Sequence, residues 1–247
     1  MSISITISKT PEENGALAAA LIAQKINTAI KQNGEARIVL STGASQFEMF
    51  VELIRQKVDW TKVVMFHLDE YVALPETHKA SFRKYLKERF TTKVQLKKAF
   101  FVNGEGNIED NITALSNELR RRPIDVGVIG IGENGHIAFN DPPADFDSDM
   151  AYKVVNLDTK CRMQQVHEGW FAELESVPRQ AISMLPKQIM SCGCIVSIVP
   201  HLVKAQAVYD TITSPVSPMI PATLMKTHPD WHLFADHDAA SKLCSFK

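Results

Sequence analysis

The chain has 247 residues, of which 45% are hydrophobic and 22% are charged, and its formal net charge is −1. This length suits one large α/β domain or two small ones. The near-zero charge excludes the basic surface that would make nucleic acid the expected partner. The four cysteines (Cys161, Cys192, Cys194 and Cys244) lack a zinc-binding spacing, so we expect reduced thiols and no metal site. With no leader or membrane-spanning run visible, the sequence predicts a soluble, cytoplasmic protein without a membrane partner.

Hydrophobic periodicity predicts helices and strands that alternate along the whole chain. The first helix has the clearest limits, because Thr10 can cap it, Pro11 can occupy its first position and Gly34 can end it. The predicted helices span residues 11–31, 46–57, 79–90, 108–122, 162–170, 185–190, 222–228 and a segment that starts near 200. The predicted strands span 37–40, 63–66, 99–102, 126–131, 152–157, 194–199 and 231–235, and residues 177–183 are expected to be extended.

This order of elements predicts the fold class. Alternating strands and helices form α/β proteins, in which a mostly parallel sheet carries helices on both faces. We therefore expect a doubly wound, Rossmann-like sheet. No linker or internal repeat divides the chain, so a single domain should cover residues 1–247.

The stretch of residues 124–143 carries the clearest candidate site. Its buried strand ends in the loop of residues 132–135, whose glycines allow a sharp turn and a close approach to a ligand. His136 and Asp141 follow, and a histidine oriented by a carboxylate can carry protons. Open α/β sheets bind ligands just past the carboxyl ends of their strands. A tight turn with a surface histidine is the alternative, but so many titratable groups at one strand end favour a functional site.

Candidate binding residues also follow three further predicted strands. The loop of residues 41–45, Ser-Thr-Gly-Ala-Ser, can point backbone N–H groups at a phosphate or can be an ordinary helix cap. Asp69 and Glu70 are either a second catalytic site or two acids that cap a strand. Lys204, in the first turn of a predicted helix, is either a phosphate anchor or a solvated surface lysine.

Two of these stretches resemble a known family. Residues 68–72 (Leu-Asp-Glu-Tyr-Val), followed by Leu74-Pro75 and His78, are similar to one signature of the glucosamine-6-phosphate deaminases. Residues 130–142 (Gly-Ile-Gly-Glu-Asn-Gly-His-Ile-Ala-Phe-Asn-Asp-Pro) resemble the second signature. The resemblance covers the whole chain in order. The 6-phosphogluconolactonases share the fold and part of the second motif, but they usually carry Asp-Glu-Arg in the first and lack the Ala-Phe-Asn-acid-Pro end.

The resemblance implies isomerisation and deamination of glucosamine 6-phosphate to fructose 6-phosphate and ammonia, by acid–base catalysis and without a cofactor. His136, oriented by Asp141, would open the sugar ring, and Asp69 would move a proton from C2 to C1. The implied catalytic residues are Asp69, Asn134, His136 and Asp141. The implied substrate-binding residues are Thr42, Gly43, Ala44, Ser45, Glu70, Gly135, Arg162 and Lys204.

The chain departs from the family pattern at several of these positions. Asn134 stands where many members have an aspartate of the ring-opening relay, and an amide cannot take up a proton at working pH. Asp141 replaces the commoner glutamate, and Ala44 stands where many relatives have a second glycine. A phosphate-binding arginine of some relatives has no gapless equivalent: Gln165 occupies the position and Arg162 is the nearest arginine.

Some family members are hexamers that N-acetylglucosamine 6-phosphate activates through a basic site between subunits. The corresponding stretch here, residues 145–149, is acidic, so we expect no such activation. The expected partner is a small-molecule sugar phosphate, and the sequence leaves open whether the chain forms a homo-oligomer.

Three alternatives remain at this point. The chain could be a 6-phosphogluconolactonase, or a deaminase of another hexosamine phosphate such as galactosamine 6-phosphate. It could be a non-catalytic sugar-phosphate sensor, although no helix-turn-helix segment or basic face is visible. It could also be a degenerate relative that binds the sugar but turns it over poorly, which Asn134 keeps open.

Overall fold

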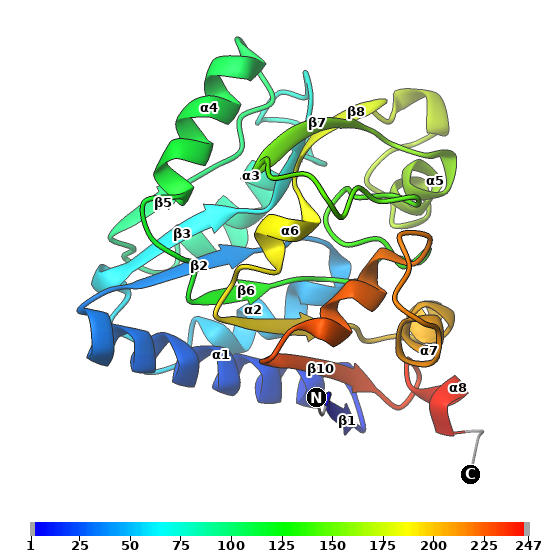
Figure 1. Ribbon diagram of the computed structural model, residues 1–247, viewed down its shortest axis with the longest axis horizontal. Coiled ribbons are helices and arrows are strands. Elements are labelled where there is room, and N and C mark those ends of the chain that lie inside the picture. Colours follow the sequence, from blue (N-terminus) through cyan, green and yellow to red (C-terminus); the bar gives the residue numbers. More distant parts are fainter. Residues whose placement is uncertain (1–2, 245–247) are drawn as a thin grey trace.

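A seven-stranded parallel sheet forms the centre of the computed structural model, which describes residues 3–244 (Figure 1). The strand order is β1-β10-β9-β6-β2-β3-β5. The strands are β1 (Ser4–Ser8), β2 (Ala36–Leu40), β3 (Val63–His67), β5 (Lys98–Phe100), β6 (Val126–Val128), β9 (Cys194–Ile198) and β10 (Trp231–Asp236). The strands β2, β3, β6 and β9 are buried along their whole length, as expected where helices cover both faces of a parallel sheet.

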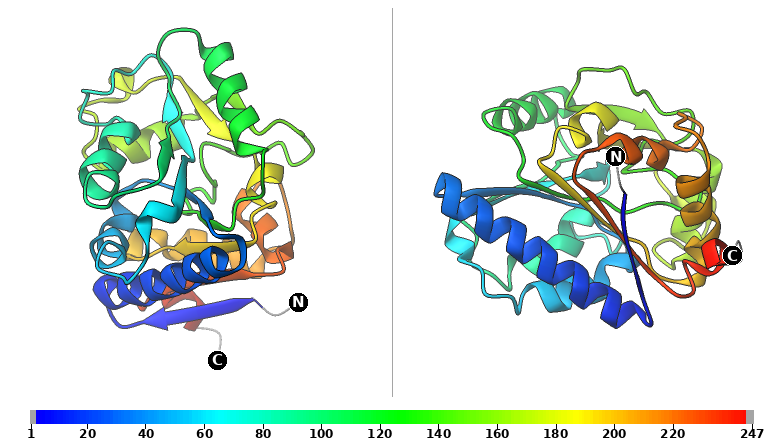
Figure 2. Two further views of the ribbon diagram at one scale, coloured as in Figure 1. Left: turned by 90° about the vertical axis from the view of Figure 1, so that its left-hand side faces the viewer. Right: turned by 60° about the horizontal axis from the view of Figure 1, so that its bottom comes forward.

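Helices pack on both faces of this sheet. Successive residues of β2 point to opposite sides, so that Ile38 and Leu40 join one hydrophobic core and Val39 joins the other. The first core contains α1 (Pro11–Asn33), α2 (Phe47–Leu53) and α3 (Phe82–Leu86), and the second contains α4 (Ile108–Leu119), α6 (Pro186–Ile189) and α7 (Ala205–Thr213). Figure 2 shows α1 lying across one face, opposite α4 and α6. The predicted α/β fold class is confirmed.

A second, smaller sheet lies beyond the carboxyl ends of the central strands. It is antiparallel, in the order β4-β8-β7, and consists of β4 (Asp69–Tyr71), β7 (Tyr152–Asn156) and β8 (Gln180–Met184). The sequence predicted β7 and an extended segment at β8, but it did not predict a separate sheet. Only Leu68 separates β3 from β4, so the chain passes directly from the large sheet into the small one.

The predicted helix ends are correct where the capping residues are specific. Thr10 Oγ1 accepts a hydrogen bond from the N–H of Glu13 (3.2 Å), and Gly34 ends α1 in the left-handed conformation with φ 74°. A helix without such capping residues is shorter than predicted: α2 ends at Leu53, whereas the sequence predicted a helix up to residue 57. Strand β1 was not predicted at all. Two short helices complete the structure: α5 (Thr159–His167) and α8 (Ser241–Cys244).

All strands of the large sheet run parallel, but the side on which the chain adds new strands reverses between the neighbours β2 and β6. From β2 the chain continues to β3 and β5 on one side, and from β6 it continues to β9 and β10 on the other. Open α/β sheets bind ligands at such a switch point, outside the carboxyl ends of the strands. Within residues 3–244, no helix combines the length and the apolar composition needed to cross a membrane.

Candidate active site

A cavity opens at this switch point, beyond the carboxyl ends of β2, β3, β6 and β9. Four groups that the sequence analysis selected line it together: residues 42–45, Asp69, His136 and Lys204. Side chains of α5 and the rings of Phe82 and Phe139 complete its wall. Residues that lie far apart in the sequence therefore meet over one space, as their positions at strand ends predicted.

The loop after β2 enters the cavity at the start of a helical segment. Gly43 has φ 108°, a conformation that side chains with a Cβ rarely adopt. Ala44 begins the 3₁₀ turn Ala44–Gln46, so the alanine that departs from the family pattern needs no unusual backbone angles. Gln46 Nε2 holds the loop by donating to Ser45 Oγ (2.9 Å) and to the Ile198 carbonyl (3.1 Å). The N–H groups at such a helix start are suited to an anion.

Lys204 supplies positive charge to the same cavity as this loop. The side chain is buried, with 6% of the residue exposed, and it ends the 3₁₀ turn Leu202–Lys204. Burial lowers the pKa of the ammonium, whereas the charges of Glu168 and Glu133 raise it. No carboxylate of the described residues lies within ion-pair distance of Lys204. Its charge is therefore available to an anion that enters the cavity.

Asp69 and Glu70 lie on opposite sides of β4, because successive side chains of a strand alternate. Asp69 faces the cavity and is 5% exposed. Glu70 is fully buried and accepts hydrogen bonds from the N–H groups of Phe82 (3.2 Å) and Arg83 (2.8 Å) and from Ser81 Oγ (2.9 Å). The predicted substrate contact of Glu70 is thus corrected: its carboxylate caps α3 and lies outside the cavity.

The two acids influence each other through space. Burial, and secondarily the charge of Glu70, raise the pKa of Asp69 well above its ordinary value. Burial also raises the pKa of Glu70, although four hydrogen bonds to its carboxylate oppose that effect. Burial and the charge of Glu70 therefore both disfavour the ionised form of Asp69. A cation beside this carboxyl would favour the ionised form.

His136 and its partners follow β6. His136 Nδ1 lies 3.3 Å from Asp141 Oδ1, so Nε2 is the ring nitrogen left for a ligand in the cavity. Asn134 joins the two residues, because its Nδ2 donates to Asp141 Oδ1 (3.2 Å) and its Oδ1 accepts from the His136 N–H (3.1 Å). Burial alone would raise the pKa of Asp141, but His136, the Asp158 N–H and Asn134 together lower it.

Gly132 is required by the position of the His136 ring. A Cβ added at Gly132 would lie 2.2 Å from Cε1 and 2.3 Å from Nε2 of that ring. The histidine therefore packs directly on the backbone of the glycine loop. This contact by itself explains why residue 132 of the motif is a glycine, whether or not a ligand binds nearby.

Two other predicted binding residues lie outside the cavity. Gly135 forms a turn, because its N–H donates to the Gly132 carbonyl (3.0 Å) and its own carbonyl accepts from the Ala222 N–H (2.9 Å). The Arg162 guanidinium donates to the carbonyls of Leu174 and Val177 and ties α5 to the following loop. Neither residue lines the cavity, so a contact of either one with the substrate stays a prediction.

The cavity is lined by two residues of α5, Gln164 and Gln165, and by Glu168 directly after the helix, and only Gln165 was noted in the sequence. Gln165, which occupies the position of the family arginine, accepts a hydrogen bond from the Tyr71 hydroxyl (2.9 Å). Gln164 accepts from the Glu133 N–H (3.1 Å) and donates to Glu168 (2.7 Å). Glutamines and glutamates on a short helix usually belong to a solvated face, so nothing in the pattern marked them.

Two groups of side chains in the described structure have the composition of a metal site. The first consists of His136, Asp141 and Cys161, and the second of Cys194, Asp230 and His232. In each group the cysteine is far in sequence from the other two members, which is why the cysteine spacing did not reveal these groups. The cysteines Cys161, Cys192 and Cys194 are free and buried, and the side chain of Cys244 lies outside the described part.

Comparisons with known proteins agree with this geometry. Residues 9–232 match the family described as glucosamine-6-phosphate isomerases/6-phosphogluconolactonase. A glucosamine-6-phosphate deaminase of Listeria welshimeri is 37% identical over 205 residues, which cover 83% of this chain and 86% of the relative. One of Streptococcus pneumoniae is 34% identical over 212 residues, which cover 85% and 88%.

Solved structures show the same arrangement. A monomeric glucosamine-6-phosphate deaminase superposes with a TM-score of 0.88 at 27% identity, and the match covers 96% of this chain and 99% of that one. A 6-phosphogluconolactonase of Thermotoga maritima superposes with a TM-score of 0.79 at 14% identity, covering 95% and 100%. The second likeness concerns the fold alone.

Proposed function

The chain belongs to the family of glucosamine-6-phosphate isomerases and 6-phosphogluconolactonases, and on this premise we propose that it converts glucosamine 6-phosphate and water into fructose 6-phosphate and ammonia. One observation carries the proposal. Asp69 and His136 come from the ends of two different strands and line the same cavity as the loop of residues 42–45 and Lys204. An acid, a proton shuttle and an anion site would thus surround one sugar phosphate bound in this cavity.

The phosphate group would occupy the cavity between the loop of residues 42–45 and Lys204. The helix start supplies N–H donors, and the ammonium of Lys204 supplies the opposite charge. Fixing the phosphate holds the sugar carbons at a defined distance from Asp69 and His136. Such positioning lowers the entropy cost of reaction.

Ring opening is the first proton transfer. His136 Nε2 would accept the proton of the C1 hydroxyl and deliver it to the ring oxygen as the bond between C1 and that oxygen breaks, which yields the open-chain aldehyde. Asp141 fixes the ring through Nδ1 and stabilises the imidazolium form. Asn134 takes part only as a hydrogen-bonding residue that holds Asp141 and the His136 backbone.

Asp69 then moves a proton from C2 to C1. Removal of the C2 proton, with transfer of one ammonium proton of the substrate to the C1 oxygen, leaves an enol-amine between C1 and C2; return of the first proton from Asp69 to C1 leaves a C2 iminium. The ammonium group of the substrate is a cation beside Asp69 and offsets the burial that favours the neutral acid. The substrate therefore helps to create the base that attacks it.

Hydrolysis completes the reaction. Water adds to the C2 iminium, ammonia leaves with the nitrogen, and the oxygen of water becomes the C2 carbonyl of fructose 6-phosphate. No electrons enter or leave, so the chemistry needs only acids, bases and positioning groups. We propose that one domain, residues 1–247, performs all steps in the cytoplasm. The free buried thiols Cys161, Cys192 and Cys194 agree with a reducing compartment.

The alternative activities differ in their products. A 6-phosphogluconolactonase would release acid from the lactone and no ammonia, and the likeness to such enzymes at 14% identity concerns the fold. A deaminase of galactosamine 6-phosphate would release ammonia from that epimer instead. A sensor would bind the sugar phosphate and leave it unchanged.

The test is ammonia and fructose 6-phosphate formation by the purified protein from glucosamine 6-phosphate. Galactosamine 6-phosphate and 6-phosphogluconolactone serve as parallel substrates. We expect equal amounts of the two products from glucosamine 6-phosphate. Binding without product, or faster turnover of either parallel substrate, would contradict the proposal.

A further inference from the structure

A group of ligand-type side chains lies behind the His136 ring, on the side away from the cavity. The nitrogen of His136, a carboxylate oxygen of Asp141 and the sulfur of Cys161 all lie within 4.8 Å of one another. Cys161 comes from α5 and is 1% exposed. The proposed reaction uses His136 and Asp141 but assigns nothing to this thiol.

The Nδ1 atom of His136 in this group lacks a hydrogen-bond partner among the described residues. His136 Nδ1 is buried, its residue is 8% exposed, and within residues 3–244 it has no hydrogen bond of good geometry. Its contact with Asp141 Oδ1 is 3.3 Å long. A buried polar atom without a strong partner indicates that another group can bind there.

The residues around this group hold two of its members in place. The Asp158 N–H donates to Asp141 Oδ2 (3.0 Å), and the Cys161 N–H donates to Asp158 Oδ1 (2.6 Å). The Asn134 amide fixes the other oxygen of Asp141. Metal ligands are commonly oriented by such secondary hydrogen bonds.

We propose that His136, Asp141 and Cys161 form a binding site for a divalent transition-metal ion of the zinc type, and that the bound ion inhibits the enzyme. A nitrogen, an oxygen and a sulfur donor are the ligands that Zn²⁺ takes in proteins, with water as a fourth. Tetrahedral bonds of about 2.0–2.3 Å place ligand atoms roughly 3.3–3.7 Å apart. The 3.3 Å contact of His136 and Asp141 already has this spacing.

The charges of the three ligands and the softness of the thiolate sulfur limit which ions the site would bind. A carboxylate and a thiolate balance the two charges of the ion, while the imidazole stays neutral. The thiol proton passes to solvent when the sulfur binds. Mg²⁺ and Ca²⁺ require oxygen ligands and would leave Cys161 unused. The site therefore selects zinc-type ions over the alkaline-earth ions.

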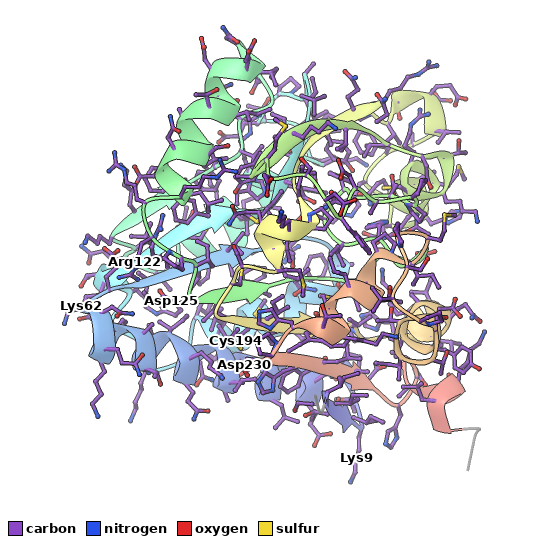
Figure 3. All side chains as sticks on the ribbon, in the orientation of Figure 1. Lys9, Lys62, Arg122, Asp125, Cys194 and Asp230 are labelled. Carbon is purple, nitrogen blue, oxygen red and sulfur yellow. The ribbon has the colours of Figure 1, made fainter. Side chains whose placement is uncertain are left out.

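The second group, Cys194, Asp230 and His232, is a poorer candidate. Lys25 Nζ lies 2.6 Å from Asp230 Oδ2, so an ammonium already occupies the carboxylate that an ion would need. His232 Nε2 contacts the other oxygen of Asp230 at 2.8 Å. Figure 3 shows Cys194 and Asp230 together, where β9 and β10 begin. This group provides a matched control.

Inhibition follows from the position of the ion and rests on the proposed function. An ion bound to His136 Nδ1 and to Asp141 would replace the direct contact between these two residues and would place a positive charge beside the His136 ring. The ring then loses the contact with Asp141 that orients Nε2 toward the C1 hydroxyl and the ring oxygen. Ring opening, which needs this orientation, would stop even though the cavity stays open to the substrate.

Cobalt reports the site without any assay of activity, because a Co²⁺–thiolate bond has a charge-transfer band in the near ultraviolet. The chelator-treated protein, its Cys161→Ser variant and its Cys194→Ser variant are titrated with Co²⁺. We expect the band, at one equivalent, in the wild type and in Cys194→Ser. Cys161→Ser should lack it and bind the ion at least about tenfold more weakly.

The outcomes separate clearly. A band that survives in Cys161→Ser, disappears in Cys194→Ser or is absent from the wild type overturns the proposed site. His136→Gln provides a second variant, in which Co²⁺ affinity should also fall at least about tenfold. Circular dichroism before the titration shows whether each variant is folded.

Inhibition is measured separately as ammonia release in the presence of Zn²⁺. The wild type should lose its activity at a Zn²⁺ concentration at which Cys161→Ser keeps its own metal-free rate. Equal inhibition of both proteins would overturn the inhibitory role. If neither protein releases ammonia, the proposed function fails, and the cobalt titration still decides the metal site.

Discussion

Asn134 Nδ2 donates a hydrogen bond to Asp141 Oδ1 over 3.2 Å, and this bond keeps the carboxylate beside the His136 ring. An aspartate at position 134 could not donate in its ionised form. The residue that departs from the family pattern therefore has a defined structural role. It holds the one carboxylate that the proton shuttle needs.

The first prediction concerns Asn134→Asp. Two carboxylates about 3 Å apart cannot both ionise easily, so the pair should keep one shared proton and release it at a raised pKa. Below that pKa the pair carries one negative charge, as in the wild type. Above it, repulsion displaces Asp141 from His136. We expect kcat of the variant to fall with rising pH in a range where wild-type kcat is constant; identical pH profiles would contradict this.

The second prediction concerns Asp69→Asn. An amide cannot accept the C2 proton, so kcat should fall by about 10²–10⁴-fold. Exchange of the C2 hydrogen with deuterium from solvent should stop, because this exchange needs the same base. His136→Gln is the matched comparison, since it should slow ring opening and leave Asp69 intact. Exchange that persists in Asp69→Asn would remove Asp69 from the proposed role.

How much of this site could be predicted depended on the distance between its parts. His136 and Asp141 lie in one turn, so their spacing alone predicted the contact that the structure shows. The loop of residues 42–45 was recognisable because a strand, a glycine and a helix follow each other. Such local patterns are contained in a short stretch of sequence.

The remaining features depend on how distant segments pack. The choice between Asp69 and Glu70 requires the register of β4 against β8, which no local pattern reveals. The small antiparallel sheet joins residues 69–71 with residues 180–184, and its formation depends on tertiary contacts. Gln164 and Cys161 belong to α5, whose polar sequence resembled a solvated helix.

The third prediction concerns the pH dependence of kcat/KM. Burial and the charge of Glu70 raise the pKa of Asp69, and the reaction needs its ionised form. As pH falls, kcat/KM should therefore decline at a pH well above the ordinary aspartate pKa of about 3.9. Glu70→Gln removes one cause of the shift and should move the decline to lower pH. A decline at the ordinary value in the wild type would contradict the proposed role of burial.

The fourth prediction concerns Lys204→Met, which keeps the length of the side chain and removes its charge. Loss of a charged hydrogen bond of about 1.5–3 kcal/mol should raise KM for the sugar phosphate about 10- to 100-fold. Glucosamine without phosphate should be handled equally by variant and wild type. Lys160→Met is the control, because Lys160 is exposed and does not line the cavity. Unchanged KM in Lys204→Met would place the phosphate elsewhere.

The last prediction concerns stability and the corrected role of Glu70. Its carboxylate accepts hydrogen bonds from the first N–H groups of α3 and lies 3.4 Å from Arg83 Nε. Glu70→Gln turns an amide donor toward these donors, which should lower the free energy of unfolding by about 1–3 kcal/mol. For a chain of this size the melting temperature should fall by about 2–4 °C per kcal/mol.

Glu105→Gln is the matched control for this change, because Glu105 contacts the same arginine from the surface. Its carboxylate lies 2.7 Å from Arg83 Nη2 but its side chain is 44% exposed, so solvent screens the pair. Exposed ion pairs contribute only about 0–1 kcal/mol. Urea unfolding should therefore separate the two variants clearly. Equal losses of stability would mean that Glu70 contributes only through Arg83, whereas a larger loss in Glu70→Gln shows that this carboxylate also caps α3.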